Sequence, residues 1–259
     1  MRWTILATLL AAGAYSMQAE AGDMPTGFLN VETTVGEETR RAVIYVPAEY
    51  SPDLAWPMVV FLHGAGERGD DGLIPTEVGI GSAIRRFPDR YPAIVLFPQC
   101  PADAYWNSIE DHLDALMALA RERYRIDEDR LYLTGLSMGG YGCWTWGAAT
   151  AERWAAMMPI CGGGNVNDLG GLMKEPMPDD AYPPLKDRVK ALAKMPIWAF
   201  HGLADETVPS FRTKQMVRML ENEGGEPRHT EYEGVGHNSW DRAYQDRRVA
   251  RWLFRQERE

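Results

Sequence analysis

A chain of 259 residues, 45% hydrophobic and 25% charged, has the composition of one large globular domain with enough apolar side chains for a sizeable core. The formal net charge is −10, and no cluster of Lys and Arg is interleaved with aromatic residues. These totals exclude a disordered chain and make nucleic acid and anionic membrane surfaces poor candidate partners.

The first 21 residues have the pattern of a signal peptide. Arg2 precedes an apolar run over residues 5–15, and Ala19-Glu20-Ala21 supplies the small-x-small pattern that signal peptidase cleaves. The run is shorter than a membrane span requires, although an uncleaved anchor remains an alternative. The sequence therefore predicts a secreted or periplasmic protein in which residues 22–259 form a single domain.

Strands and helices alternate along most of the remaining chain. An opening pair of strands over residues 28–35 and 41–46 precedes predicted strands at 58–62, 93–97, 131–136, 156–161, 197–200 and 230–232. Predicted helices cover residues 110–124, 138–150, 186–193 and 210–223, and a last one buries Val249, Trp252 and Leu253. Continuous apolar runs suit strands that are buried on both faces. We therefore predict an α/β fold with a mostly parallel central sheet and helices on both faces.

Residues 165–185 differ from the rest of the chain. They contain four prolines and several acidic residues without a steady period, which predicts a long irregular insertion after the strand ending near Cys161. Such an insertion forms either mobile surface or a lid over a site. Because it leaves the sheet at the edge where the candidate site lies, a lid is the favoured interpretation.

Three cysteines, Cys100, Cys143 and Cys161, are an odd number for an oxidising compartment. At most one intramolecular disulfide can form, and the sequence does not choose the pair. All three lie among apolar neighbours, so three buried and unpaired thiols are an equally good interpretation. None of them has the spacing of a metal ligand.

The most informative motif is the Gly-x-Ser-x-Gly sequence at residues 135–139, between a predicted strand and a predicted helix. This pattern is typical of a sharp turn that lifts one serine hydroxyl, here that of Ser137, above the end of a sheet. Gly135 and Gly139 would be small because a side chain there would collide with facing backbone. By itself the motif is equally compatible with a plain strand-turn-helix junction.

A second glycine-rich loop, His63 to Gly69, follows the strand at 58–62 and contains a literal Gly-x-Gly-x-x-Gly. A dinucleotide site would require a helix that opens within the glycines, but residues 70–75 have the chemistry of a loop. The better interpretation is a loop that points a backbone amide, that of Ala65, at a developing oxyanion.

Three loops at the carboxyl edge of the predicted sheet carry Ser137, Asp205 and His237, in that order along the chain. A serine hydroxyl is a weak nucleophile, so it needs a base such as His237 to take its proton. Asp205 would orient the imidazole, with Glu206 or Asp241 as alternatives. The amides of Met138 and Ala65 would stabilise the oxyanion.

Other polar and aromatic residues lie near this edge. His63 and His201 end buried strands and are expected to hydrogen-bond to loops rather than to act as bases. Trp106, Trp240 and Glu67 are candidate substrate-binding residues, since aromatic side chains often form the wall of an apolar or sugar-binding pocket. Ordinary loop packing is the alternative for both tryptophans.

Together these blocks resemble bacterial carboxylesterases of the polyhydroxybutyrate depolymerase and feruloyl esterase type. The resemblance covers the chain from about Arg40 to its end and is carried by Phe61 to Gly69, Pro98-Gln99-Cys100-Pro101, Gly135 to Gly140, Trp198 to Gly202 and Gly236 to Trp240. It implies an α/β-hydrolase fold, no metal or other cofactor, and hydrolysis of carboxylic esters through an acyl-enzyme. It also implies a catalytic triad of Ser137, Asp205 and His237.

We therefore expect a secreted serine carboxylesterase for short-chain or aryl esters, such as acetyl or feruloyl groups, in a small molecule or on plant polysaccharide. A serine peptidase of the prolyl oligopeptidase type is less favoured, because we expect no propeller domain before the catalytic domain. A catalytically inactive binding module is the third hypothesis. The acyl group, the alcohol and the oligomeric state stay open.

Overall fold

The structure is a computed structural model that describes residues 24–164 and 185–258. The predicted signal peptide at residues 1–21 lies outside the described residues, and so does the predicted insertion up to residue 184. Within the described part, no helix is both long and apolar enough to cross a membrane.

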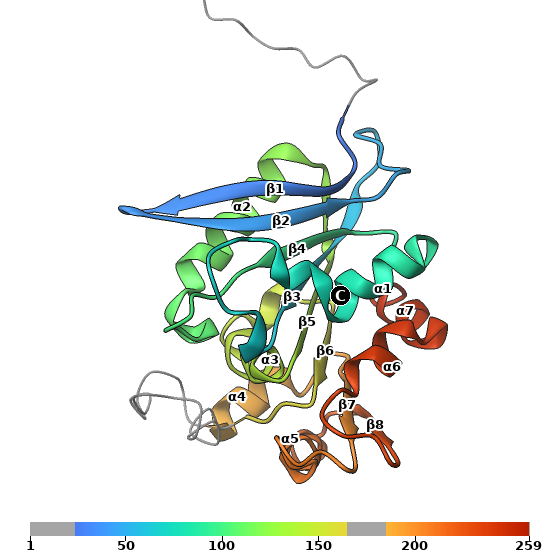
Figure 1. Ribbon diagram of the computed structural model, residues 1–259. Helices are drawn as coiled ribbons and strands as arrows, with labels where there is room; N and C mark the ends of the chain where they lie inside the picture. The colour runs from blue at the N-terminus through green and yellow to red at the C-terminus, as the bar shows by residue number, and fades with distance from the viewer. Residues whose placement is uncertain (1–23, 165–184, 259) are drawn as a thin grey trace, which may run out of the picture.

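A single eight-stranded sheet runs through the described residues in the order β1-β2-β4-β3-β5-β6-β7-β8 (Figure 1). The strands are β1 Gly27–Val35, β2 Glu38–Val46, β3 Trp56–Leu62, β4 Ile94–Pro98, β5 Ile126–Leu136, β6 Ala156–Ile160, β7 Trp198–Gly202 and β8 Arg228–Tyr232. Strand β2 pairs antiparallel with both β1 and β4, and all other neighbours are parallel. The predicted mostly parallel sheet is confirmed.

Helices cover both faces of this sheet, as predicted. They are α1 Gly79–Arg86, α2 Glu110–Arg123, α3 Met138–Ala149, α4 Leu185–Leu192, α5 Phe211–Asn222, α6 Trp240–Gln245 and α7 Arg247–Leu253. Helices α1, α6 and α7 lie on one side of the sheet, and α2 to α5 lie on the other (Figure 1). The buried apolar side chains of each group belong to a separate cluster. Of the seven, α1 and α6 were not predicted.

Strand β3 shows why its sequence reads as an unbroken apolar run. Val60 and Leu62 belong to the cluster on one face of the sheet, whereas Val59 and Phe61 belong to the cluster on the other, and all four are at most 1% exposed. Because neighbouring side chains point to opposite faces, a strand covered on both faces must be apolar at every position. This burial fixes the carboxyl end of β3, where the loop from His63 begins.

The three cysteines are buried and unpaired, the second of the two interpretations of the sequence. Burial raises the pKa of the Cys100 thiol to about 12 and raises the pKa of Cys143 and Cys161 as well. Because only the thiolate reacts readily, we expect a disulfide reagent such as DTNB to label no cysteine in the native protein and all three in denaturant. Release of a single thiol in non-reducing denaturant would contradict this result by showing a disulfide.

Candidate active site

Ser137 stands at the junction of β5 and α3, in the backbone conformation that the motif predicts. Its φ of 52° and ψ of −117° are sterically unfavourable for a residue with a side chain. Its N–H donates to the carbonyl of Ile160 at 3.0 Å, which ties the turn to the neighbouring strand β6. The surrounding sheet therefore holds the strained turn in place.

The two glycines that flank Ser137 have the steric role inferred for them. A Cβ atom at Gly139 would overlap the carbonyl oxygen of Leu62, and one at Gly135 would overlap the carbonyl of Gly139. Backbone atoms of buried strands cannot move aside as a flexible side chain can. Strand β3, strand β5 and the start of α3 can approach this closely only because these positions carry no side chain.

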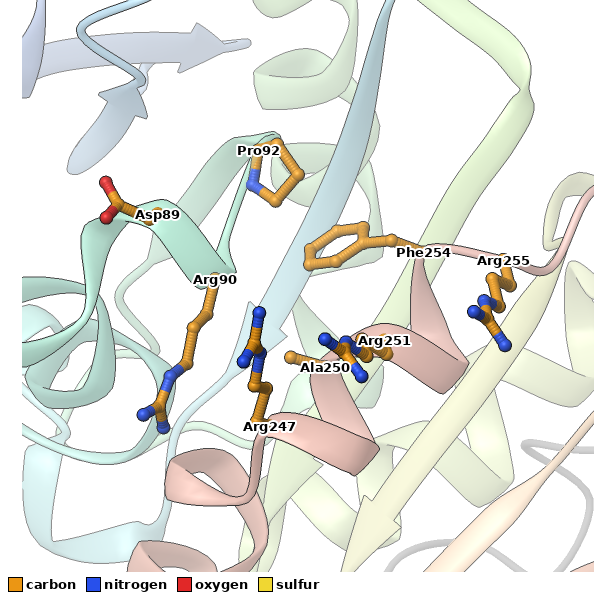
Figure 2. Close-up of a pocket in the computed structure, with 8 residues that line it drawn as sticks. All are labelled: Asp89, Arg90, Pro92, Arg247, Ala250, Arg251, Phe254 and Arg255. Atoms are coloured by element: carbon orange, nitrogen blue, oxygen red, sulfur yellow. The ribbon is translucent and has the colours of Figure 1, made fainter.

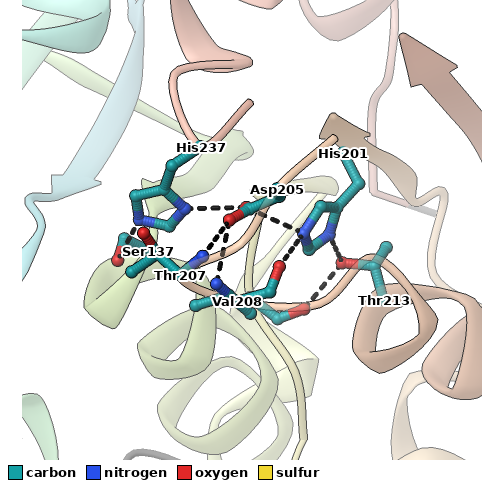
Figure 3. Close-up of polar contacts among 8 residues, drawn as sticks. Ser137, His201, Asp205, Thr207, Val208, Thr213 and His237 are labelled. Atoms are coloured by element: carbon teal, nitrogen blue, oxygen red, sulfur yellow. Dashed lines mark hydrogen bonds and ion pairs between the residues drawn. The ribbon is translucent and has the colours of Figure 1, made fainter. Parts of the chain in front are cut away.

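A continuous chain of hydrogen bonds joins Ser137, His237 and Asp205 (Figure 3). The Nε2 atom of His237 lies 2.9 Å from Ser137 Oγ, and its Nδ1 atom lies 2.7 Å from Asp205 Oδ2. An ionised carboxylate only accepts, so Nδ1 carries the proton and Nε2 is left to accept from the serine hydroxyl. This is the tautomer in which an imidazole can act as a base toward Ser137.

Asp205 is held rigidly in its loop. Its Oδ1 atom accepts hydrogen bonds from the amides of Thr207 and Val208, both at 2.9 Å, and its side chain is fully buried. Burial by itself would raise the pKa of Asp205, but hydrogen bonds from His201, His237 and the Val208 amide hold it well below its usual range. The carboxylate is therefore ionised over the whole range in which an imidazole titrates.

Backbone hydrogen bonds hold the loops after β7 and β8 together. The Leu203 amide donates to the carbonyl of Tyr232 at 3.0 Å, and the Ala204 amide donates to that of Val235 at 2.9 Å. A Cβ atom at Gly202 would overlap the carbonyl of Val235, so this close approach needs glycine. No local pattern in the sequence indicates this pairing. It brings the loop that carries Asp205 next to the loop that carries His237.

The two amides predicted to line an oxyanion site start helical turns. Met138 is the first residue of α3, and Ala65 is the first residue of a 3-10 turn over Ala65–Glu67. The first amides of a helical turn have no partner within that turn, so they are available to an anion. The loop from His63 also passes directly over the serine, because a Cβ atom at Gly64 would lie 3.6 Å from Ser137 Cβ.

The structure changes the interpretation of Trp106. Its side chain is only 2% exposed, and its indole N–H donates to the carbonyl of His63 at 3.1 Å. The ring packs edge-on against the His63 ring at a centroid distance of 4.7 Å. Trp106 therefore supports the loop from beneath, and its expected place on a substrate-binding surface is wrong.

Trp240 and Glu67 both lie beside the site. The Trp240 ring contacts the imidazole of His237 edge-on, with 5.4 Å between centroids. Glu67 places a carboxylate oxygen next to Gly64, in the loop that crosses Ser137, and burial raises its pKa although hydrogen bonds from backbone amides oppose this. Both side chains are partly exposed, so each can meet a bound molecule.

Three other polar candidates, His63, Glu206 and Asp241, are not part of this chain of hydrogen bonds. His63 is fully buried, donates from Nδ1 to Gly64 and accepts from the Cys100 amide at 3.0 Å, and burial lowers its pKa to about 4. Glu206 is exposed, and Asp241 accepts from the Asn238 side chain at 2.9 Å. Asp205 is therefore the residue that orients His237.

Among the described residues, Cys161, Asp205 and His237 have donor atoms within 4.8 Å of one another, as a metal site would require. Asp205 and His237 are hydrogen-bonded to each other, however. Burial raises the pKa of the Cys161 thiol, so its sulfur remains protonated. The cluster suits proton transfer better than metal binding. That the protein uses no metal or other cofactor remains a prediction.

A cavity of about 430 Å³ lies elsewhere, between α7 and the segment before β4 (Figure 2). It is lined by Asp89, Arg90, Pro92, Arg247, Ala250, Arg251, Phe254 and Arg255. Arg90 donates to the carbonyl of Gln245 at 2.6 Å, and Arg251 lies in the last turn of α7, where the helix dipole favours a cation. No residue of the Ser137 site lines this cavity, so the two are separate.

Comparison with known proteins gives a family match. The model described as the prolyl oligopeptidase family matches residues 103–257, a range that contains Ser137, Asp205 and His237. Among solved structures, a thermostable esterase is 34% identical with a TM-score of 0.73, over 89% of this chain and 63% of that one. This chain therefore spans less than two thirds of that esterase.

Two more distant structures share the fold. A CE1 ferulic acid esterase from Anaeromyces mucronatus is 17% identical, with a TM-score of 0.64 over 92% of this chain and 93% of that one. An acylaminoacyl peptidase from Pyrococcus horikoshii is 16% identical, with a TM-score of 0.65 over 88% of this chain and 40% of that one. At such identities the likeness is one of fold.

Proposed function

This chain belongs to the prolyl oligopeptidase family and has the α/β-hydrolase fold of a serine hydrolase, and from this premise we propose that it is a secreted or periplasmic carboxylesterase. Its proposed substrates are short-chain or aryl esters, of the acetyl or feruloyl kind. The observation that carries the proposal is the set of hydrogen bonds that joins Ser137, His237 and Asp205. The similarity of this protein to a thermostable esterase points the same way.

The proposed reaction begins at Ser137. Its Oγ attacks the ester carbonyl carbon while its proton passes to Nε2 of His237, 2.9 Å away. The imidazolium is stabilised by the Asp205 carboxylate and then gives the proton to the leaving alcohol as the C–O bond breaks. The acyl group is left on Ser137. A water molecule then attacks the acyl-enzyme in the same way, with His237 again as the base. This second step releases the carboxylic acid and restores the serine hydroxyl.

The negative charge of each tetrahedral intermediate falls on the former carbonyl oxygen. We place that oxygen between the amides of Met138 and Ala65, and a backbone donor in such a place typically lowers the barrier by about 3 kcal/mol. The Trp240 ring and the Glu67 carboxyl lie beside the site and are the proposed contacts for the substrate. The proposal of export is supported by the sequence of residues 1–21 alone.

The acyl preference is supported by the ferulic acid esterase that shares the fold. A direct test is a panel of p-nitrophenyl acetate, butyrate and octanoate, methyl ferulate, acetylated xylan and a peptide anilide. We expect the acetate or the ferulate to give the highest kcat/KM. Preference for octanoate would overturn the proposed acyl class, and inactivity on every ester would overturn the esterase itself.

A serine peptidase is the second candidate, because the matching family and the acylaminoacyl peptidase both point to it. The same panel separates the two functions. Hydrolysis of the peptide anilide with a kcat/KM similar to that for the best ester would favour the peptidase. If the mature protein were an inactive binding module, a fluorophosphonate probe would fail to label Ser137.

A further inference from the structure

His201 lies on the side of Asp205 that faces away from His237 and is part of the same network (Figure 3). It belongs to β7, and its side chain has no exposure to solvent. Its Nδ1 atom lies 2.7 Å from Thr213 Oγ1, and its Nε2 atom lies 2.8 Å from the Val208 carbonyl and 3.1 Å from Asp205 Oδ2. Both ring nitrogens therefore have close polar partners in a dry environment.

The partners of His201 determine where its protons are. Thr213 Oγ1 also lies 2.6 Å from the carbonyl of Gly162, which can only accept, so the single hydroxyl proton points at that carbonyl. Toward His201 the same oxygen must then accept, which requires a proton on Nδ1. On the other side of the ring, a carbonyl and a carboxylate both accept, which requires a proton on Nε2 as well.

We propose that His201 is a permanently protonated, fully buried imidazolium that positions Asp205 and partly neutralises it. This inference rests on the proposed roles of Asp205 and His237. His201 touches neither the substrate nor the reacting atoms, so it is a positioning residue. A buried cation is tolerated here because a carboxylate, a carbonyl and a hydroxyl satisfy all of its protons.

Two consequences follow for the site. First, Asp205 receives two hydrogen bonds on each oxygen, one of them from the charged ring of His201, so its orientation toward His237 is fixed. Second, the cation offsets part of the carboxylate charge that His237 experiences. The base then takes up a proton from solvent less readily, and activity extends to lower pH.

Other titratable groups surround the pair. Among the described residues they include His229 and Glu231 on β8, Lys214 on α5 and Cys161 after β6, with the exposed Glu221 of α5 farther out. Lys214 and Glu231 form an ion pair at 3.1 Å, burial lowers the pKa of His229, and burial raises the pKa of Cys161. Lys214 and Glu231 offset each other, and His229 and Cys161 are neutral near pH 7. Asp205, whose Oδ2 atom lies 3.1 Å from His201 Nε2, is therefore the counter-ion of His201.

The proton count is tested directly by NMR of the wild-type protein with ¹⁵N-labelled histidine, with His201 assigned by comparison with His201→Gln or Thr213→Ser. We expect two ring N–H signals from His201, both still present at pH 8, because a fully buried ring exchanges its protons slowly. A single N–H signal from this ring would overturn the proposal. The measurement does not depend on turnover, so it separates this inference from the proposed esterase function.

The effect on the base is tested through the pH dependence of kcat/KM for the best ester. Thr213→Val removes the acceptor of the Nδ1 proton, so His201 becomes neutral and the acid limb should move to higher pH. His201 and His237 bond to the same oxygen of Asp205 and are within about 6 Å of each other, so we expect a shift of about one pH unit.

Thr213→Ser is the matched control, because it keeps the hydroxyl and should keep the acid limb of the wild type. His201→Gln should shift the limb in the same direction as Thr213→Val. A merely structural role would lower kcat/KM at every pH without moving the limb, and that outcome in Thr213→Val would overturn the proposal. If His201→Gln does not fold, the comparison of Thr213→Val with Thr213→Ser and the NMR spectrum of the wild type still test the proposal.

Discussion

Ser137→Ala is expected to lower kcat for the best ester of the panel by roughly 10⁶-fold, the loss that removal of the nucleophile causes in a serine hydrolase. The Oγ atom lies 2.9 Å from the base, and no water held in its place could form the acyl-enzyme. Steady-state kinetics on purified mature protein, with a fluorophosphonate probe as a second readout, measure the effect.

The fold should tolerate this change. Alanine experiences the same strain as serine at a φ of 52°, and the hydroxyl makes its bond to His237 rather than to the core. We expect the free energy of unfolding, measured by urea denaturation, to change by no more than a surface substitution causes, about 0.5 kcal/mol. Ser51→Ala, in a loop before β3, is the matched control and should keep full activity. Retention of a hundredth of the activity in Ser137→Ala would contradict the role of Ser137.

The sequence predicts the elements that the sheet itself requires. Strands β3 to β7 read correctly because their apolar runs are buried on both faces, and α2 reads correctly because its apolar residues recur on one side. Once the sheet is parallel, the loops that carry Ser137, Asp205 and His237 must meet at one edge. The order of three residues in the chain was therefore enough to predict their association in space.

Helix α1 shows what the sequence could not predict. It begins with Gly79-Ile80-Gly81, and glycine is unfavourable inside a helix. The helix forms because Ile80 and Ile84 are buried against the sheet, and a Cβ atom at Gly81 would overlap the carbonyl of Thr76. Packing against distant segments overrides local propensity here, and no local pattern reports that packing.

Contacts between distant loops limit the prediction of the site in the same way. Trp106 sits in a loop at the expected edge, but it points inward because the carbonyl of His63 accepts its indole N–H. His201 was expected to hydrogen-bond to a loop, and it does so through the Val208 carbonyl. Its Nε2 atom also bonds Asp205, and its Nδ1 atom bonds Thr213, eight residues beyond that carboxylate and on a separate helix, α5.

The second large effect is expected from Gly139→Ala, which adds only a methyl group. That Cβ atom would overlap the carbonyl oxygen of Leu62 and would lie 2.8 Å from that of His63, both of them backbone atoms at the buried end of β3. Neither atom can move without shifting the strand, so we expect a loss of about 3–5 kcal/mol in the free energy of unfolding, measured by urea denaturation.

Gly66→Ala is the control for stability, because nothing lies within 4 Å of a Cβ atom there and its backbone is not left-handed. It should change the unfolding free energy by less than about 0.5 kcal/mol. Since the end of β3 leads into the loop that carries the Ala65 amide, any Gly139→Ala protein that still folds should also lose kcat. A variant as stable and as active as the wild type would show that β3 and the Ser137 turn are not held this close together. The proposed placement of the Ala65 and Met138 amides around the oxyanion would then be wrong.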